Sequence, residues 1–418
     1  MPQIRNFTEA QDLLRPYYDN SRTAYTLDLM RALMEYLGNP QNKLKVLHVA
    51  GTSGKTSTAY YCAALLKESG KSVGLSVSPH VDTVNERLQI NGLPLPEAEF
   101  CAVLGAFVDL VMASGLKPSY FELLVAMAYW EFARRGLDYV VMEVGLGGLL
   151  DGSNVVDSAN KVCVITDIGF DHTEILGDTL AQIASQKAGI IQRNNAVFMY
   201  QQNEEVMDVV EKVTTQQQAS LHAQSPDSAV TYQSLPLFQQ RNLGLAAKAV
   251  DYVLNRDADQ HVSDEALQQA ASIVVPARLE RFKIGDKLVI VDGSHNQQKL
   301  ATLLESVSEL YPGKDIAAVC AFVEGNDERW QGGLQELTLV AKHLIFTNFY
   351  SEQDVPKSSV DPAKLVAFCD AHNFKSYEVM REPAAAYEAL LARAEPVLVV
   401  TGSFYLLNHI RPLMKVQA

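Results

Sequence analysis

A glycine-rich loop between a predicted strand and a predicted helix carries the residues best suited to bind a phosphate group. Residues 45–50 (KVLHVA) are typical of a buried strand. The loop that follows consists of Gly51, Thr52, Ser53, Gly54, Lys55, Thr56 and Ser57. Backbone N–H groups at such a loop and helix start can face an anion, and Lys55 can neutralise its charge. The strict pattern GxxxxGK[ST] is not met, because Val49 stands where its first glycine would be. The flanking strand and helix still favour a phosphate loop over a glycine-rich turn with a surface lysine.

Three further candidates lie where predicted strands end, which is the edge of an open α/β sheet that holds ligands. Glu143 lies near the end of an apolar strand predicted over 139–144, beside a glycine-rich turn. Its carboxylate could bind a divalent cation or accept hydrogen bonds from loop amides, and both alternatives stay open. Asp292 and His295 follow a strand predicted over 287–292, just where a helix begins.

Lys187 is unusual because it falls on the apolar face of a helix predicted over 178–188. It lies four residues after Ile183 and three after Ala184. A lysine in such a place usually extends its ammonium group to solvent. Partial burial would instead lower its pKa and make a neutral amine available for reaction.

Helical and strand patterns alternate nearly throughout, which predicts an α/β architecture with largely parallel sheets. The capping-box pattern of Ser119 and Glu122 precedes one predicted helix, 119–135. After Pro276 the alternation of predicted strands and helices begins again, so we expect domains at 1–280 and 285–418. Strands are predicted at 45–50, 72–78, 139–144, 161–166, 287–292, 316–322, 343–348, 376–380 and 396–401. The other helices before Pro276 are predicted over 178–188, 204–218, 242–255 and 264–273, besides the one after the phosphate loop.

Composition narrows the class of protein further. At ~150 residues per domain, 418 residues suggest two or three domains, and 48% apolar residues exclude disorder. The charge of 35 − 49 = −14 disfavours nucleic acid and anionic membranes as partners. Five scattered cysteines without a CxxC pair argue against zinc or a disulfide framework. Neither a signal peptide nor a membrane span is evident. We therefore expect a cytoplasmic protein.

Several segments along nearly the whole chain match one family in its own order. They are HVAGTSGKTS (48–57), SPHVDTVNERLQINGLPL (78–95), SYFELLVAMA (119–128), EVGLGGLLDGSN (143–154), ITDIGFDHTEILGDTLAQIASQKAGII (165–191), PARLE (276–280), DGSHN (292–296) and TGSFYL (401–406). On these segments the chain resembles the folylpolyglutamate synthase and dihydrofolate synthase family of the Mur ligase superfamily. The resemblance implies an N-terminal P-loop ATPase domain with a parallel-rich sheet and a smaller C-terminal Rossmann-like α/β domain, with the site in the cleft between them.

The resemblance also implies a magnesium site and a modified lysine. Glu143, Ser78 in SPH, His172 in DHT and Lys187 match the family's metal ligands. The lysine that Lys187 matches is carbamylated, which converts a cation into a carboxylate. From the residues alone, Ser78 would be a turn hydroxyl and His172 a loop histidine. Lys55, Lys187 and His172 are the expected catalytic residues, with Mg²⁺ and ATP as cofactors.

ATP and the acyl substrate take two further sets of residues in the resembling family. The ATP set is Gly51, Thr52, Gly54, Lys55, Thr56, Ser57, Asn242, Arg278, Asp292 and His295. Asn242 would contact adenine, Asp292 the ribose, and Arg278 and His295 the phosphates. From the residues alone, Asn242 could equally be a helix N-cap. The pterin-substrate set is Ser119, Tyr120, Phe121, Glu122, Asp151, Gly152 and Ser153.

The chain departs from the family pattern mostly near the substrate stretches. The usual family sequence is GLGGRLDATN. In this chain Leu149 replaces its Arg, Gly152 its Ala and Ser153 its Thr. A usual His-Gln pair is replaced by Phe238-Gln239. A DKD-like turn appears as Val323-Glu324-Gly325-Asn326-Asp327, without its lysine. These differences put substrate preference in doubt more than ATP chemistry.

The expected reaction is ATP-dependent addition of L-glutamate to a folate, and to dihydropteroate as a further substrate, through an acyl phosphate. The partners are then small molecules, with neither nucleic acid nor membrane, and the chain is expected to be a monomer. Two alternatives stay open. One is a Mur-type ligase with a different acyl acceptor, which the short segment before the phosphate loop disfavours. The other is a non-catalytic nucleotide-binding paralogue, which the joint presence of Lys55, Glu143, His172 and Lys187 disfavours.

Overall fold

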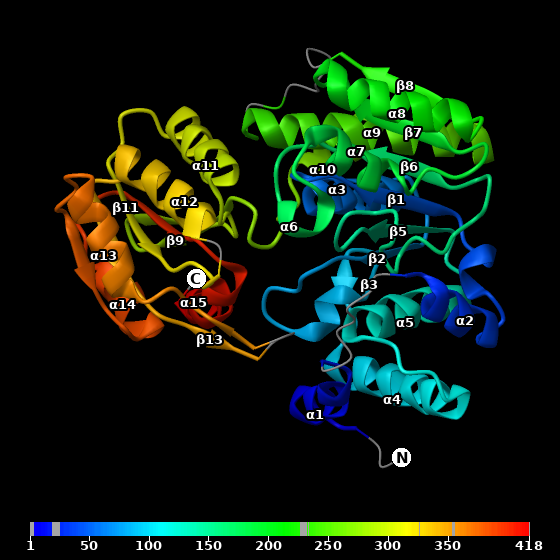
Figure 1. The fold of residues 1–418 in the computed structure, drawn as a ribbon, viewed down its shortest axis with the longest axis horizontal. Helices are drawn as coiled ribbons and strands as arrows, with labels where there is room; N and C mark the ends of the chain where they lie inside the picture. Colours follow the sequence, from blue (N-terminus) through cyan, green and yellow to red (C-terminus); the bar gives the residue numbers. More distant parts are fainter. Residues whose placement is uncertain are drawn as a thin grey trace. The chain divides into compact units, whose positions relative to one another are not determined.

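Strands and helices alternate in two units, Met1–Ile273 and Val274–Ala418, each built on its own sheet (Figure 1). The computed structural model describes residues 4–18, 26–225, 232, 234–325, 327–352 and 356–417. Asn326, in the turn that lacks the family's lysine, lies outside the described residues.

An eight-stranded sheet in the order β4-β3-β2-β5-β1-β6-β7-β8 forms the centre of the first unit. The strands from β2 to β8 in that order pair in parallel, whereas β3 and β4 add an antiparallel edge. The strands are β1 Val46–Ala50, β2 Val73–Ser76, β3 Gln89–Ile90, β4 Leu93–Pro94, β5 Tyr139–Glu143, β6 Val162–Ile165, β7 Ala196–Tyr200 and β8 Ser220–Gln224.

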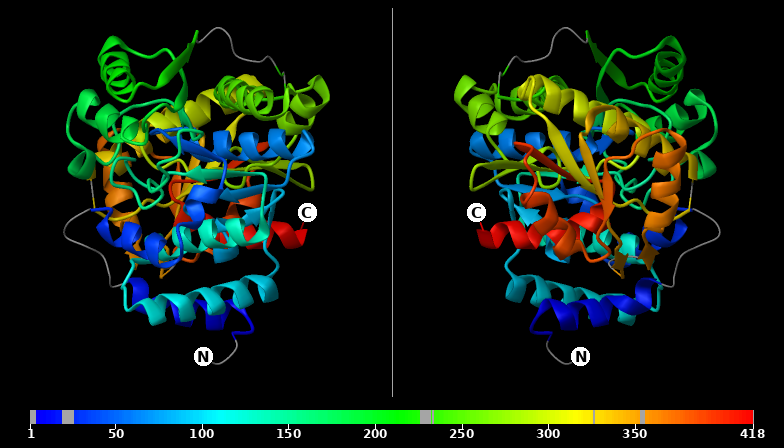
Figure 2. Two further views of the ribbon diagram at one scale, coloured as in Figure 1. Left: turned by 90° about the vertical axis from the view of Figure 1, so that its right-hand side faces the viewer. Right: turned by 90° about the vertical axis from the view of Figure 1, so that its left-hand side faces the viewer.

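Helices cover both faces of this sheet (Figure 1). They are α1 Phe7–Tyr18, α2 Asp28–Tyr36, α3 Lys55–Glu68, α4 Glu97–Ser114, α5 Tyr120–Arg135, α6 Thr173–Leu176, α7 Leu180–Ala188, α8 Glu204–Gln216, α9 Leu237–Ala258 and α10 Asp264–Ala271, with 3₁₀ turns η1 Pro40–Lys43 and η2 Val84–Arg87. Figure 2 shows α1 and α4 side by side, where they contact each other.

The central strands are buried on both faces, and their side chains alternate between two hydrophobic cores. On β5, Val140 and Met142 pack into the core that contains α4 and α5. Tyr139 and Val141 pack into the opposite core, together with side chains of α3 and α9. The apolar runs in the sequence therefore become strands whose ends, rather than faces, are free to carry polar groups.

The second unit has a six-stranded sheet in the order β15-β12-β11-β16-β10-β9, parallel except for β9. Its strands are β9 Glu280–Ile284, β10 Lys287–Val291, β11 Ile316–Cys320, β12 His343–Phe346, β15 Tyr377–Val379 and β16 Val397–Thr401, with a separate hairpin of β13 Tyr350–Ser351 and β14 Lys357–Ser358. Its helices are α11 Gln297–Leu310, α12 Asp327–Val340, α13 Pro362–Ala371, α14 Pro383–Leu391 and α15 Phe404–Gln417.

The predicted α/β class is confirmed, with a parallel-rich first sheet and a second α/β unit. The division between the units, at 273/274, comes earlier than the predicted 280–285. The segment before β9 belongs to the second unit as well, because the Ala277 carbonyl accepts from the Gly293 N–H and the Leu279 N–H donates to Asp292, while β9 itself pairs with β10. In the described part of the chain, no helix is long and apolar enough to cross a membrane.

Candidate active site

The phosphate loop connects β1 to α3, as predicted, and two of its glycines are required by their surroundings. Gly51 has a φ of 150°, and a Cβ atom there would lie 1.8 Å from Thr166 Oγ1. Gly54 has a φ of 87°, and a Cβ atom there would lie 2.5 Å from Asn242 Oδ1. Only glycine fits such close approaches in a left-handed conformation. The Asn242 amide therefore lies directly against the phosphate loop.

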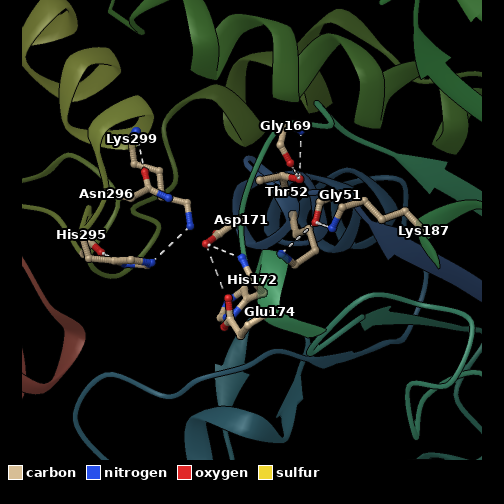
Figure 3. Close-up of polar contacts among 12 residues, drawn as sticks. Gly51, Thr52, Gly169, Asp171, His172, Glu174, Lys187, His295, Asn296 and Lys299 are labelled. Carbon is tan, nitrogen blue, oxygen red and sulfur yellow. Dashed lines mark hydrogen bonds and ion pairs between the residues drawn. The ribbon is translucent and has the colours of Figure 1, made fainter. Parts of the chain in front are cut away.

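The segment after β6 supports the loop from a distant part of the sequence. The N–H groups of Thr52 and Ser53 donate hydrogen bonds to the Asp167 carbonyl, at 2.8 and 3.3 Å. The Thr52 hydroxyl donates to the Gly169 carbonyl at 2.9 Å (Figure 3). Thr166 Oγ1 donates to the Ser53 carbonyl at 2.6 Å. The sequence predictions did not include these supporting residues, because no local pattern connects them to the loop.

Two lysine side chains meet at the carbonyl oxygen of Gly51. Lys55 Nζ donates to it at 3.1 Å and Lys187 Nζ at 2.8 Å (Figure 3). Lys187 is 4% exposed, so the alternative in which its ammonium group extends to solvent is wrong. Its backbone lies near the end of α7, which brings the side chain under the loop. The Lys55 cation at the start of a phosphate loop can stabilise a polyphosphate.

Glu143 accepts hydrogen bonds on both carboxylate oxygens. Thr56 Oγ1 donates to Oε1 at 2.8 Å, and the Ser78 N–H donates to Oε2 at 3.2 Å. Glu143 is buried at the end of β5. Mg²⁺ in phosphate-binding sites typically takes one or two carboxylates together with phosphate oxygens and water. One buried carboxylate beside two hydroxyl residues and a phosphate loop fits that preference.

Two acidic neighbours lie close to the His172 imidazole. Its Nε2 lies 3.9 Å from Asp171 Oδ1, and its Nδ1 lies 3.6 Å from Glu174 Oε1 (Figure 3). Among the residues that the structure describes, no three His, Cys, Asp or Glu side chains form a group suited to hold a metal ion. The role of His172 as a metal ligand stays a prediction.

The two predicted substrate segments lie against each other. A Cβ atom added to Gly152 would be 3.4 Å from Glu122 Cγ and 3.5 Å from the Phe121 ring, which are ordinary contacts. The alanine that the family has at this position would therefore fit. Glu122 and Ser119 form the predicted capping box, in which the Ser119 N–H donates to Glu122 Oε2 at 2.8 Å. Tyr120 is buried beneath the Arg87 guanidinium, which lies 5.2 Å from the ring centroid.

A buried polar chain connects this region to the phosphate-loop strand. His48 on β1 hydrogen-bonds through Nε2 to Ser153 Oγ at 2.8 Å, and Ser153 Oγ donates to Asp151 Oδ1. Asp151 Oδ2 accepts from the Leu146 N–H at 2.8 Å. Burial raises the pKa of Asp151, and burial together with the Lys161 cation lowers the pKa of His48 well below its ordinary value. Asp151 and Ser153 thus hold the glycine-rich turn in place.

The buried, neutral His48 predicts a loss of stability in acid. In the unfolded chain a histidine takes up a proton near pH 6.5, whereas folded His48 resists protonation. The free energy of unfolding should therefore fall as the pH falls below about 6.5, by up to about 1.4 kcal/mol per pH unit from this group. Urea unfolding at pH 7.5 and 5.5 should show about 1 kcal/mol more loss for the wild type than for His48→Gln. Equal losses would contradict the prediction.

The predicted nucleotide residue on α9 lies inside the helix. Asn242 belongs to Leu237–Ala258, so the alternative that it is an N-cap is wrong, and its amide contacts the phosphate loop as described above. Its neighbour Arg241 pairs with Asp167 at 2.8 Å, and burial raises the pKa of Asp167 while Arg241 opposes that shift. The helix begins at Leu237, earlier than the predicted 242, so Phe238 and Gln239 are helical.

The predicted nucleotide residues of the second unit are held by the loop between β10 and α11. Asp292 accepts from the Ser294 N–H at 2.8 Å and the Leu279 N–H at 2.7 Å. His295 Nδ1 lies 2.8 Å from the Gly293 carbonyl, so this nitrogen carries a hydrogen, and Lys299 Nζ lies 3.3 Å from Nε2 (Figure 3). The sequence predictions missed Lys299, although its spacing of four from His295 at a helix start could have indicated it.

The fold and the phosphate loop define a class: ATP-dependent ligases of the Mur type. The Mur ligase middle domain matches residues 115–244, and the Mur ligase glutamate ligase domain matches residues 277–404. The dihydrofolate synthase/folylpolyglutamate synthase of Bacillus subtilis (strain 168) is 30% identical over 93% of this chain and 95% of its own length. The folylpolyglutamate synthase of Lacticaseibacillus casei is 30% identical over 97% and 98%.

Solved structures agree with these relatives. The structure of Mycobacterium tuberculosis folylpolyglutamate synthase complexed with ADP matches with a TM-score of 0.85 and 26% identity, over 98% of each chain. The chain therefore belongs to the folylpolyglutamate synthase and dihydrofolate synthase family of ATP-dependent ligases. The predicted resemblance is confirmed.

Proposed function

We propose that this protein uses ATP to join L-glutamate to a folate, and also to dihydropteroate. One observation carries the proposal: Lys55 and Lys187 both donate to the Gly51 carbonyl at the start of the phosphate loop. This geometry places the Lys55 cation where the β- and γ-phosphates of ATP would meet the loop and helix N-terminus, with the Lys187 nitrogen buried beside it. Membership of the family supports glutamate as the amine and a folate as the acid.

The reaction proceeds in two balanced steps. A carboxylate oxygen of the acyl substrate attacks the γ-phosphorus, the bond to the β-phosphate oxygen breaks, and ADP leaves an acyl phosphate. The amine of glutamate then attacks the acyl carbon, and inorganic phosphate leaves as the amine loses its proton. Lys55 offsets the charge that develops on the transferred phosphoryl group, and the loop N–H groups orient it. No protein nucleophile takes part.

The proposed metal site consists of Glu143 with Ser78, His172 and Lys187, and Thr56 orients the Glu143 carboxylate. Mg²⁺ held by these residues would neutralise phosphate charge. Lys187 takes part as a carbamate, formed when its neutral amine attacks CO₂ and releases a proton. Support for this comes from its burial and its position under the loop.

The proposal also assigns the residues that contact the nucleotide and the pterin, the cellular compartment and the oligomeric state. Asn242 contacts adenine, Asp292 the ribose, and Arg278 and His295 the phosphates. Ser119–Glu122 and Asp151–Ser153 bind the pterin portion of the substrate, which their mutual contact supports. We place the enzyme in the cytoplasm, which is consistent with five buried cysteines that are all free thiols, and we expect a monomer.

Two parallel assays test the activity. The purified protein is supplied with ATP, Mg²⁺ and either dihydropteroate or tetrahydrofolate, and phosphate release is measured with and without glutamate. We expect glutamate-dependent release with both acyl substrates. Release with only one of them narrows the activity to that substrate. Nucleotide binding without glutamate-dependent release from either would identify a non-catalytic paralogue and reject the proposal.

Leu149 offers a test of substrate preference, because its backbone is hydrogen-bonded while the residue is exposed enough for a substitution. The Leu149 N–H donates to the Gln186 carbonyl at 2.7 Å, and Leu149 as a whole is 41% exposed. Leu149→Arg restores the family's cation near the substrate segments. The KM for the anionic folate should fall about two- to fivefold, the range of an exposed ion pair, while the KM for ATP stays constant.

The matched control is Leu150→Arg, since Leu150 is also 41% exposed and next in the chain. It should leave the KM for the folate unchanged. Equal changes in the KM values for ATP and folate, or no change in either, would show that position 149 does not select the substrate.

A further inference from the structure

Two residues on either side of Arg278 adopt a left-handed backbone conformation. Ala277 has a φ of 54° and Leu279 a φ of 48°, although neither is glycine. Such conformations are unfavourable for residues with a Cβ atom and persist only where surrounding contacts impose them. Both are buried, whereas Arg278 between them is partly exposed, with its guanidinium 4.5 Å from the centroid of the Phe404 ring. The guanidinium also donates to the Ala277 carbonyl at 3.1 Å, so the double kink and the Phe404 ring together hold a partly exposed arginine between two buried residues.

Hydrogen bonds to both kinked residues hold this conformation. The Ala277 N–H donates to Glu280 Oε2 at 2.9 Å, and the Leu279 N–H donates to Asp292 Oδ2 at 2.7 Å. The Ala277 carbonyl accepts from the Gly293 N–H at 3.0 Å. The backbone on each side of Arg278 is therefore fixed by a buried carboxylate.

Arg411 of α15 in turn fixes one of these carboxylates. Its Nε lies 2.7 Å from Glu280 Oε2 and its Nη2 lies 2.8 Å from Oε1, and both side chains are 6% exposed. A bidentate arginine–carboxylate pair sets the orientation of the carboxylate as well as its charge. Glu280 Oε2 receives both Arg411 and the Ala277 N–H, so the ion pair acts directly on the kink.

We propose that Glu280 and Arg411 are positioning residues that present the Arg278 guanidinium to the phosphates of ATP. The inference rests on the proposed function for the assignment of Arg278 to ATP. A cation that is held in place before ATP binds loses less conformational freedom on binding, and it meets the developing phosphate charge without rearrangement. The buried ion pair with Arg411 holds the backbone around Arg278 in place, although Arg411 lies on a helix more than a hundred residues away in the sequence.

A double-mutant cycle on ATP binding tests the inference. Arg411→Lys keeps the charge but cannot form the two-point contact with Glu280. Isothermal titration with ATP and Mg²⁺ should show roughly tenfold weaker binding, the equivalent of one charge-assisted hydrogen bond. In an Arg278→Ala background the same substitution should change the Kd less than about twofold, because its effect passes through Arg278.

A second variant and a control keep the result clear. Glu280→Gln removes the charge from the other partner of the ion pair. We expect it to weaken ATP binding in the wild-type background and to have little effect in the Arg278→Ala background. This variant tests the inference if Arg411→Lys does not fold. Arg393→Lys alters a second arginine–glutamate pair in this unit, with Glu395 at 2.9 Å, and should leave ATP binding unchanged. Thermal unfolding midpoints of all variants are measured in parallel.

Each outcome bears on the inference. Equal weakening in the wild-type and Arg278→Ala backgrounds would overturn it and show a purely structural ion pair. Wild-type ATP affinity of Arg278→Ala would also overturn it, while glutamate ligation by the same protein would leave the proposed function intact. A protein that binds ATP without ligating glutamate would reject the proposed function, yet the binding cycle would still decide on Arg411.

Discussion

Replacing Lys55 with alanine is expected to lower the turnover number of glutamate ligation by about 10²- to 10³-fold, the usual effect of removing one group that stabilises transition-state charge. The ammonium lies 3.1 Å from the Gly51 carbonyl at the start of α3, where the γ-phosphate would meet the loop. The side chain is only partly buried, so the thermal midpoint should change little. Steady-state phosphate release and a melting curve measure both quantities.

Lys67→Ala is the matched control for this experiment. Lys67 belongs to the same helix, its side chain is 49% exposed, and it pairs with Glu68 at 3.2 Å. Its removal should leave the turnover number unchanged. A folded Lys55→Ala variant that ligates glutamate at nearly the wild-type rate would remove the argument for a phosphate-binding loop.

Local sequence patterns predicted the elements that carry the phosphate loop. The apolar run before Gly51 forms β1, and the small-residue face after Gly54 forms α3. The capping box of Ser119 and Glu122 also formed where its spacing indicated. In each case the signal and the structure lie within a few residues, so periodicity and capping chemistry are sufficient.

Other elements had weaker local signals. The helix α4 was not predicted, because apolar residues occur all around EAEFCAVLGAFVDLVMAS and obscure its 3.6-residue period. The strands β7 and β8 were not predicted either, because AVFMY is a short apolar run without alternation and SLHAQ is only partly apolar. Hydrophobic patterns in the sequence are therefore sufficient to predict the fold class, but not every helix and strand.

The support of the site depends on contacts between distant segments, which one sequence does not reveal. Asp167 holds the loop through its backbone carbonyl, so its side-chain type carries no information about that role. Ala277 and Leu279 are ordinary residues, and nothing in their types predicts left-handed backbone. The burial of Lys187 follows from its helix position, but its partner at Gly51 becomes evident only in three dimensions.

Lys187→Ala and Lys187→Arg are both expected to lose nearly all activity, by about 10³-fold or more, if Lys187 works as a carbamate. An arginine keeps a positive charge under the loop, but a guanidinium stays protonated and cannot attack CO₂. Retention of substantial activity by Lys187→Arg would therefore show that a cation, rather than a carbamate, is required. A carbamate nitrogen keeps one hydrogen, so the contact with the Gly51 carbonyl can persist after modification.

Labelling with ¹³C-bicarbonate measures the modification independently of activity. A carbamate carbon resonance should be present in the wild type and absent from Lys187→Ala. Lys161 is the matched control, because it is 1% exposed and donates to the Val156 carbonyl at 2.8 Å, and burial lowers its pKa. Lys161→Met should retain the resonance.

A crystal structure with nucleotide and Mg²⁺ decides between the two states of Lys187. A carbamate adds a carbon and two oxygens beyond Nζ, so it converts a donor into a metal-binding carboxylate within the same buried space. A small carboxylic acid added in excess can then restore part of the activity of Lys187→Ala, provided that the space admits it. An unmodified ammonium at Lys187 in the loaded enzyme would refute the carbamate, and Glu143 would then be the remaining buried carboxylate among the proposed metal ligands.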